Sequence, residues 1–213
     1  MRDRTAGGAG MSVQRDTHGM GRLESGFSLT ELVVAMVVAL ILMAVATPSF
    51  LHAYHSYQLS NAARQLCDIL RLTRYEAIRR NRPLNCVIQA SVSNPGMTQA
   101  SMTDTAGNAM TGVSAMTVLL GTSGNLADPS SVPGASAFPA AANLGPTAPT
   151  TVSPAGTTLQ FDARGALSTE NVTVFYLSNS GALEAGYRAV LLTPAGALQI
   201  WAGDASGNWW QLR

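Results

Sequence analysis

The most strongly patterned part of the sequence is an apolar run near its N-terminus. Residues 27–46 contain one charged side chain, Glu31, whereas residues 1–26 are polar and rich in glycine. At about 1.5 Å per residue, a helix over this run is about 30 Å long, which matches the hydrocarbon core of a bilayer. Arginines outnumber acids ahead of the run, and such an excess favours a cytoplasmic N-terminus. The pattern predicts a transmembrane segment at residues 27–50, with the rest of the chain exported.

Beyond residue 50 the helical pattern continues but becomes amphipathic. Apolar or small residues recur at steps of three and four from Leu59 to Ala77, and charged residues occupy the opposite face. Pro83 disfavours helix at the residue before it. We therefore predict one helix over residues 27–81, whose half at 51–82 packs on a folded domain. Two i,i+4 ion pairs are expected on its polar face: Arg64–Asp68 and Glu76–Arg80.

The helical period disappears after Pro83, and residues 83–213 have the pattern of a β domain. Neutral stretches at 93–114 and 122–156, the second rich in Ala, Ser, Pro, Thr and Gly, are predicted to be long exposed loops. The fold class is α+β, with an antiparallel sheet resting on the helix. The predicted strands are Asn85–Val92, Ala115–Gly121, Thr157–Phe161, Val172–Leu177, Arg188–Leu192 and Leu198–Ala202.

Composition argues against catalysis and against a large charged surface. Charged residues make up 12% of the chain and the net charge is +1, so no global electrostatic footprint for nucleic acid is present. The three histidines lie in the N-terminal quarter, and two cysteines cannot complete a zinc site. We therefore expect no metal, no cofactor and no enzymatic activity.

The apolar run admits three interpretations. Ala44-Val45-Ala46 has the form of a signal-peptidase site, so the chain could be a secreted soluble binding domain cut after Ala46. The run could also be an unprocessed anchor. The third interpretation is a precursor that is cut ahead of the run and keeps it.

The segment Gly26-Phe27-Ser28-Leu29-Thr30-Glu31 resembles the type IV prepilin motif. This resemblance implies that prepilin peptidase cuts between Gly26 and Phe27 and methylates Phe27. It also implies that Glu31 pairs with the N-terminal amine of a neighbouring subunit during assembly, and that Pro48 kinks the helix. A carboxylate within an apolar span is usually functional. The resemblance therefore favours the third interpretation.

Two further segments resemble the GspH/FimT family of pseudopilins and minor pilins. They are Arg74-Tyr75-Glu76-Ala77 at the helix end and Phe161-Asp162-Ala163-Arg164-Gly165 at a strand and turn. The resemblance implies a structural subunit at or near the tip of a type IV pilus or a type II secretion pseudopilus. Its partners would be other pilins or pseudopilins, prepilin peptidase and an inner-membrane assembly platform, and its localisation the inner membrane with a periplasmic domain.

A DNA-binding minor pilin for natural transformation is the alternative within this family. The segment Arg64–Arg82 holds six arginines against two acids, which would suit a nucleic-acid surface. A solvated helix face explains the same charges. Some DNA-uptake relatives carry a G-R-x-R turn, but the matching stretch here, Gly196-Ala197-Leu198-Gln199, has no arginine. Nucleic acid is therefore not the expected partner.

The cysteines and tryptophans leave their roles open at this level. Cys67 and Cys86 would meet an oxidising compartment after export, where they either form a disulfide or stay as buried thiols. Trp201, Trp209 and Trp210 either form a contact patch or cover the sheet edge against the helix.

Overall fold

One long helix dominates the structure, a computed structural model that describes residues 28–94, 96–110, 117–120, 124–144 and 148–212. Helix α1 runs from Leu29 to Arg80, close to the predicted bounds. The chain divides into two compact units, residues 1–43 and 44–213. At the C-terminus of α1, Asn81 has a φ of 49° and its amide donates to the Ile78 carbonyl, while Arg82 donates to Ala77. This left-handed cap satisfies the last carbonyls and ends the helix just before Pro83.

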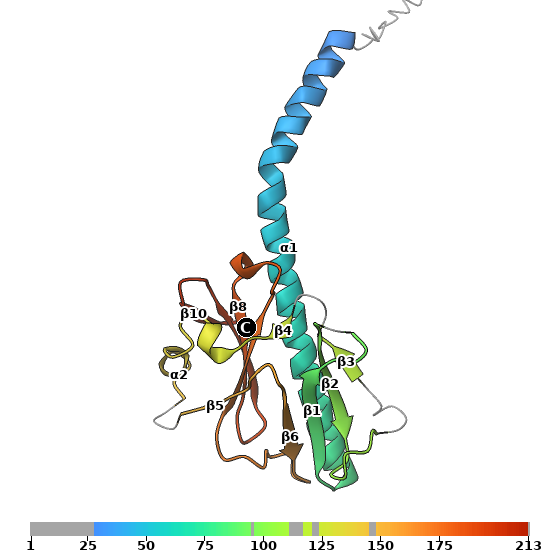
Figure 1. The fold of residues 1–213 in the computed structure, drawn as a ribbon, viewed down its shortest axis with the longest axis vertical. Helices are drawn as coiled ribbons and strands as arrows, with labels where there is room; N and C mark the ends of the chain where they lie inside the picture. Colours follow the sequence, from blue (N-terminus) through green and yellow to red (C-terminus); the bar gives the residue numbers. More distant parts are fainter. Residues whose placement is uncertain (1–27, 95, 111–116, 121–123, 145–147, 213) are drawn as a thin grey trace, which may run out of the picture. The chain divides into compact units, whose positions relative to one another are not determined.

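The first sheet is antiparallel and packs on α1 (Figure 1). Alternate residues of its central strand β1 (Leu84, Cys86 and Ile88) are fully buried, so this face meets the buried stripe of the helix. The strand order is β3 (Thr117–Leu119), β2 (Thr98–Thr103), β1 (Leu84–Ala90) and β6 (Thr157–Phe161).

The second sheet is buried on both faces at its centre. In β7 (Thr173–Ser178), Phe175 and Leu177 pack into the α1 core, whereas Val174 and Tyr176 belong to a separate core on the other side. Strand β7 is apolar along most of its length because both of its faces are buried. The strand order is β10 (Trp209–Leu212), β9 (Leu198–Gly203), β8 (Tyr187–Leu192), β7 and β4 (Asn125–Leu126), all antiparallel, with β5 (Thr150–Thr151) parallel to β7. Two short 3-10 turns lie at Pro129–Ser131 and Leu183–Ala185.

The second core corrects the prediction of one exposed loop over 122–156. Within this stretch the short helix α2 (Phe138–Ala141) places Phe138 at 0% exposure. Its ring meets those of Tyr176, Trp201 and Trp209 at centroid distances of 5.8, 5.7 and 5.0 Å in edge-on geometry. Trp201 and Trp209 thus cover the sheet face away from α1, not the edge against the helix. Phe138 is the one aromatic residue in the sequence from 122 to 156, and its small, neutral neighbours show no helix or strand pattern from which its burial could be predicted.

The predicted loop over 93–114 is also wrong in part, because it contains β2. Thr98, Ala100 and Met102 face the core and alternate with half-exposed residues. Small and weakly apolar side chains fit this position because β2 pairs with β1 along its whole length. The strand predicted at 115–121 is β3, at 117–119 within the described residues.

Candidate functional site

The N-terminal half of α1 is an exposed apolar surface within the part of the chain that the structure describes. Every residue from Ser28 to Tyr54 is exposed. By length and composition, α1 is the one helix among the described residues that could cross a membrane, and its most apolar window is 0% buried. Apolar surface of this extent is unfavourable in water and indicates a membrane or a protein partner.

Two of the predicted site residues lie on this surface. Glu31 is exposed in the first helical turn, where the helix dipole favours a carboxylate. Pro48 lies inside the continuous helix and cannot donate a backbone hydrogen bond to the preceding turn. Gly26 and Phe27, the predicted cleavage junction, lie outside the described residues.

Arg74 connects the C-terminal half of α1 to two glycine turns. Its Nη1 donates to the Gly196 carbonyl at 3.0 Å. A Cβ on Gly196 would lie 2.8 Å from Arg74 Nε, and one on Gly165 would lie 3.0 Å from Arg74 Cγ. Both glycines have positive φ, so each turn needs glycine for its backbone and for the approach to the helix. The motifs around Arg74 and around Gly165, far apart in sequence, therefore form one packed structure.

Replacing Arg74 with alanine is expected to lower the free energy of unfolding by about 1–3 kcal/mol, because the Gly196 carbonyl loses its donor and the turns lose packing. Urea unfolding of the full-length protein in detergent, followed by tryptophan fluorescence, measures this change. Arg64→Ala is the control: Arg64 is exposed, so its loss changes stability by about 0.5 kcal/mol or less. Equal effects of the two variants would contradict the role assigned to Arg74.

The turn at Gly165 belongs to a repeated pattern that sequence reasoning missed. Asp162 Oδ1 accepts from the amides of Arg164 and Ala166. Asp104 and Asp204 accept in the same way from the second and fourth residues after them. The Asn108 side chain lowers the pKa of Asp104, and Asn208 does the same for Asp204. The signal available in the sequence is the repeated D-x-x-G, which favours tight turns.

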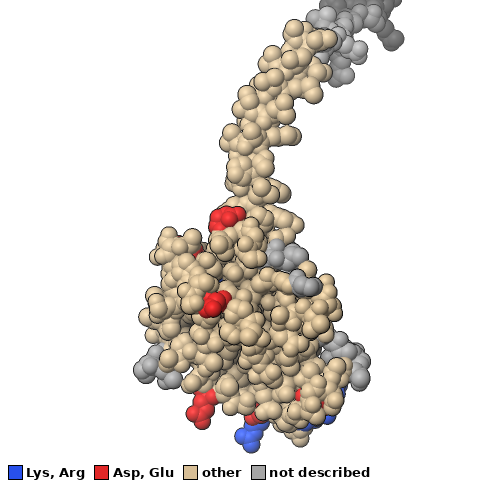
Figure 2. Space-filling view, in the orientation of Figure 1, with Lys and Arg blue, Asp and Glu red and all other residues tan. Residues whose placement is uncertain are grey.

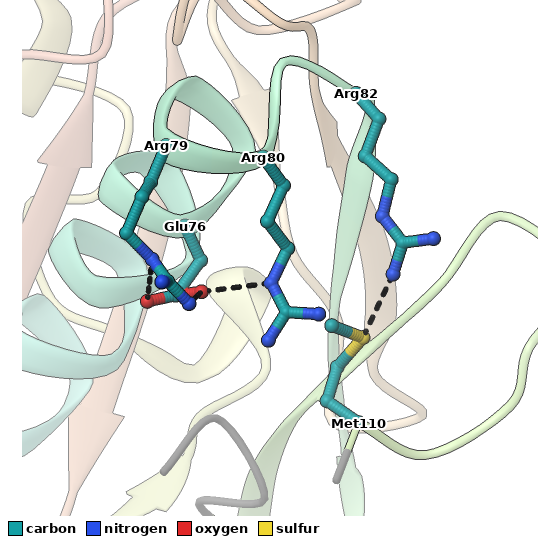
Figure 3. A network of polar contacts seen from close by, with 5 residues as sticks. All are labelled: Glu76, Arg79, Arg80, Arg82 and Met110. Atoms are coloured by element: carbon teal, nitrogen blue, oxygen red, sulfur yellow. Dashed lines mark hydrogen bonds and ion pairs between the residues drawn. The ribbon is translucent and has the colours of Figure 1, made fainter. Parts of the chain in front are cut away.

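The arginines of Arg64–Arg82 are largely engaged within the fold. Figure 3 shows Glu76 between Arg79 and Arg80, and Arg82 beside the Met110 sulfur. The Glu76 carboxylate lies 2.7 Å from Arg79 and 2.9 Å from Arg80, and Arg82 donates to the Met110 sulfur at 3.9 Å. The Glu76–Arg80 pair is therefore confirmed. The Arg64–Asp68 pair is wrong, since Asp68 pairs with Arg71 instead. Figure 2 shows a mostly uncharged surface on the face in view.

Cys67 and Cys86 are free, buried thiols in the structure. The Thr73 hydroxyl contacts Cys86, and Thr73 is six residues beyond Cys67, about 9 Å along the helix axis. The structure therefore contains the two cysteines as buried thiols and not as a disulfide. Burial raises the pKa of each thiol to about 12, which leaves both protonated and unreactive.

Arg188 ties the second sheet to the middle of α1, a role that the sequence pattern did not reveal. Its guanidinium donates to the Ser56 and Ser60 hydroxyls at 2.8 and 3.1 Å and to the Tyr187 carbonyl at 2.9 Å. Burial lowers the pKa of Arg188. One turn earlier, a ring nitrogen of His52 hydrogen-bonds the Glu184 carbonyl at 2.9 Å. The available signal is an arginine within the otherwise apolar strand β8.

Among the residues that the structure describes, no three His, Cys, Asp or Glu side chains gather where a metal ion could bind. The features that stand out are therefore an uncovered apolar helix and the contacts that fix its other half to two sheets. The exposed apolar helix is suited to contact with a membrane or with another protein.

Comparison with known proteins agrees with this arrangement. The family model described as Type II transport protein GspH matches residues 62–196, more than half of the chain. The model described as the prokaryotic N-terminal methylation motif matches residues 21–47. No curated protein matches the sequence.

Among solved structures, two crystal forms of the type IV minor pilin FimU from Pseudomonas aeruginosa are similar to this chain. Both are 18% identical to it; they cover 71% and 72% of it and 96% and 92% of their own chains, with TM-scores of 0.44 and 0.43. The family follows from the sequence matches alone. With a methylation motif leading into an exposed apolar helix and the family's own model over the domain behind it, the chain belongs to the GspH family of minor pilin and pseudopilin subunits.

Proposed function

We propose that this subunit is made as a precursor, cut by prepilin peptidase between Gly26 and Phe27, and methylated on Phe27. Residues 1–26 are then a cytoplasmic leader. Residues 27–50 hold the subunit in the inner membrane as a single span, with the domain in the periplasm, until an assembly platform transfers it. It is then packed at or near the tip of a type IV pilus or a type II secretion pseudopilus.

The observation that carries this proposal is the position of Glu31 on an otherwise apolar, uncovered helix. Within residues 28–54, Glu31 is the one aspartate or glutamate, and every residue of that stretch is exposed. When neighbouring helices cover this surface, the carboxylate needs a cation beside it. A free N-terminus at Phe27, one turn of helix before Glu31, supplies such a cation on a neighbouring subunit.

Intact mass and N-terminal sequencing of the protein from the membrane fraction of its native host test the proposal. The expected chain begins at Phe27 and is about 14 Da heavier than its unmodified mass. A soluble chain beginning at Thr47 would instead establish a secreted domain and overturn the proposal. A membrane chain that retains Met1 would exclude prepilin processing.

A further inference from the structure

A groove of about 380 Å³ separates α1 from the last two strands of the second sheet. From the helix, Arg64, Asp68 and Arg71 form one wall. From the strands, Ile200 and Leu212 line the other. Both β9 and β10 begin beyond residue 196, where the GspH match ends. The groove therefore combines the family's helix with the C-terminal strands of this chain.

Strand β10 presents an open edge to this groove. Within the described residues it pairs with β9 alone and is the first strand in the sheet order. An open edge carries backbone donors and acceptors that can pair with another extended chain. Soluble proteins commonly protect such edges with a charged residue or proline, yet Trp209–Leu212 contains neither. The edge is therefore available for an added strand.

The side chains beside this edge are apolar and accessible. Leu212 pairs with Ile200, and Trp210 pairs with Ala202, so each pair shares one face of the sheet. Ile200 packs against the α1 core, which places Leu212 and Trp210 on the side of the sheet that faces the helix. Trp210 is 49% exposed and Leu212 is 36% exposed. An added strand would therefore find apolar surface for alternate side chains.

The helix wall of the groove carries an excess positive charge. Among the residues that the structure describes, Arg64 makes no ion pair or hydrogen bond. Arg71 meets Asp68 at 3.5 Å, with both side chains more than half exposed, a contact of little energetic weight. One acid thus faces two arginines that lie two helical turns apart. An acidic side chain from a partner would complete this charge pattern.

We propose that the groove binds an extended, acidic segment of a different pilin subunit, which adds a strand to β10 and places a carboxylate between Arg64 and Arg71. The proposal rests on the assembly function above, because α1 carries both the apolar assembly surface and this wall. A second copy of this chain fits poorly: among the described residues, no aspartate or glutamate lies on a strand. Asp68 opposes nucleic acid, since its carboxylate would face the phosphates.

Photo-crosslinking of the full-length chain in its native host tests the proposal. The probe, p-benzoylphenylalanine, replaces Trp210 on β10, two residues from Leu212 of the groove lining, Leu42 on the apolar helix, or Val92, which is 87% exposed and lines no part of the groove. From position 210 we expect an adduct with another protein that carries a prepilin N-terminal motif, through a peptide containing Asp or Glu. Arg64→Glu should reduce this adduct about tenfold because like charges then meet. The matched control, Arg164→Glu on an exposed turn, should leave it unchanged.

The other outcomes separate the groove from the assembly function. Pilin adducts from position 42, with no more adduct from 210 than from 92, would overturn the groove and leave the assembly function standing. The absence of pilin adducts from position 42 as well would overturn both the groove proposal and the assembly function. A nuclease-sensitive adduct, a self-adduct from 210, or equal loss in Arg164→Glu would each contradict the proposed partner.

Discussion

Glu31→Gln is expected to abolish incorporation of the subunit into filaments without affecting its insertion or processing. Glutamine keeps the size of the side chain and removes its charge. In the proposed assembled state neighbouring helices would cover the apolar half of α1, so an N-terminal amine placed beside Glu31 would be left as a buried, unpaired cation. Removing one partner of a buried ion pair costs about 3–5 kcal/mol, which corresponds to a loss of incorporation of about a hundredfold or more.

Immunoblots of sheared filaments and of membranes measure this effect as the ratio of subunit in the two fractions. Glu170→Gln is the matched control, because Glu170 is an exposed carboxylate in a turn of the globular domain. Its ratio should equal that of the wild type. Normal incorporation of the Glu31 variant, with mature N-termini in both samples, would exclude a role for this carboxylate in assembly.

Phe138→Ala is expected to lower the free energy of unfolding of the domain by about 3–5 kcal/mol, the usual range for removing a fully buried aromatic ring. The ring is 0% exposed and contacts three other aromatic rings. Among these, Tyr176 donates to the Ala135 carbonyl at 3.3 Å, and Trp209 donates to the Gly134 carbonyl at 3.2 Å. The cavity would therefore loosen both the aromatic cluster and the chain segment around α2.

Urea unfolding of the full-length protein, followed by tryptophan fluorescence, detects this change directly because Trp201 and Trp209 adjoin the cavity. Val92→Ala removes apolar atoms from an exposed position and should alter stability by about 0.5 kcal/mol or less. A loss below about 1 kcal/mol in Phe138→Ala would mean that residues 122–156 contribute little to the core.

Much of the architecture follows from local patterns in the sequence. The apolar run and the stripe from Leu59 to Ala77 predicted one helix with a bare half and a packed half, and its ends were correct within two residues. Strands β6 to β9 were also found, because each is a short run of β-branched, aromatic or aliphatic residues with a turn signal at its end. These signals arise from neighbouring residues and need no knowledge of distant ones.

The partners of individual side chains could not be predicted in this way. The i,i+4 spacing correctly predicted the ion pair of Glu76 and Arg80. Asp68 instead pairs with Arg71 at the i,i+3 spacing, because both spacings bring side chains together on an exposed helix face. The spacing of Cys67 and Cys86 left both a disulfide and two buried thiols open; in the structure both are buried free thiols, and Cys86 contacts Thr73. Register depends on pairing across the sheet, which single-chain spacing does not specify.

The sequence therefore suffices for the membrane-type helix, the α+β class and the junction that links this chain to prepilins, since each depends on a contiguous pattern. Tertiary structure decided the rest. It placed Phe138 within the second core, made strands of the weakly apolar β2 and of the four-residue β10, and brought Gly165 and Gly196 together on Arg74. Each of these features gains its stability from burial against residues distant in the chain, so no local window contains the atoms that make it favourable.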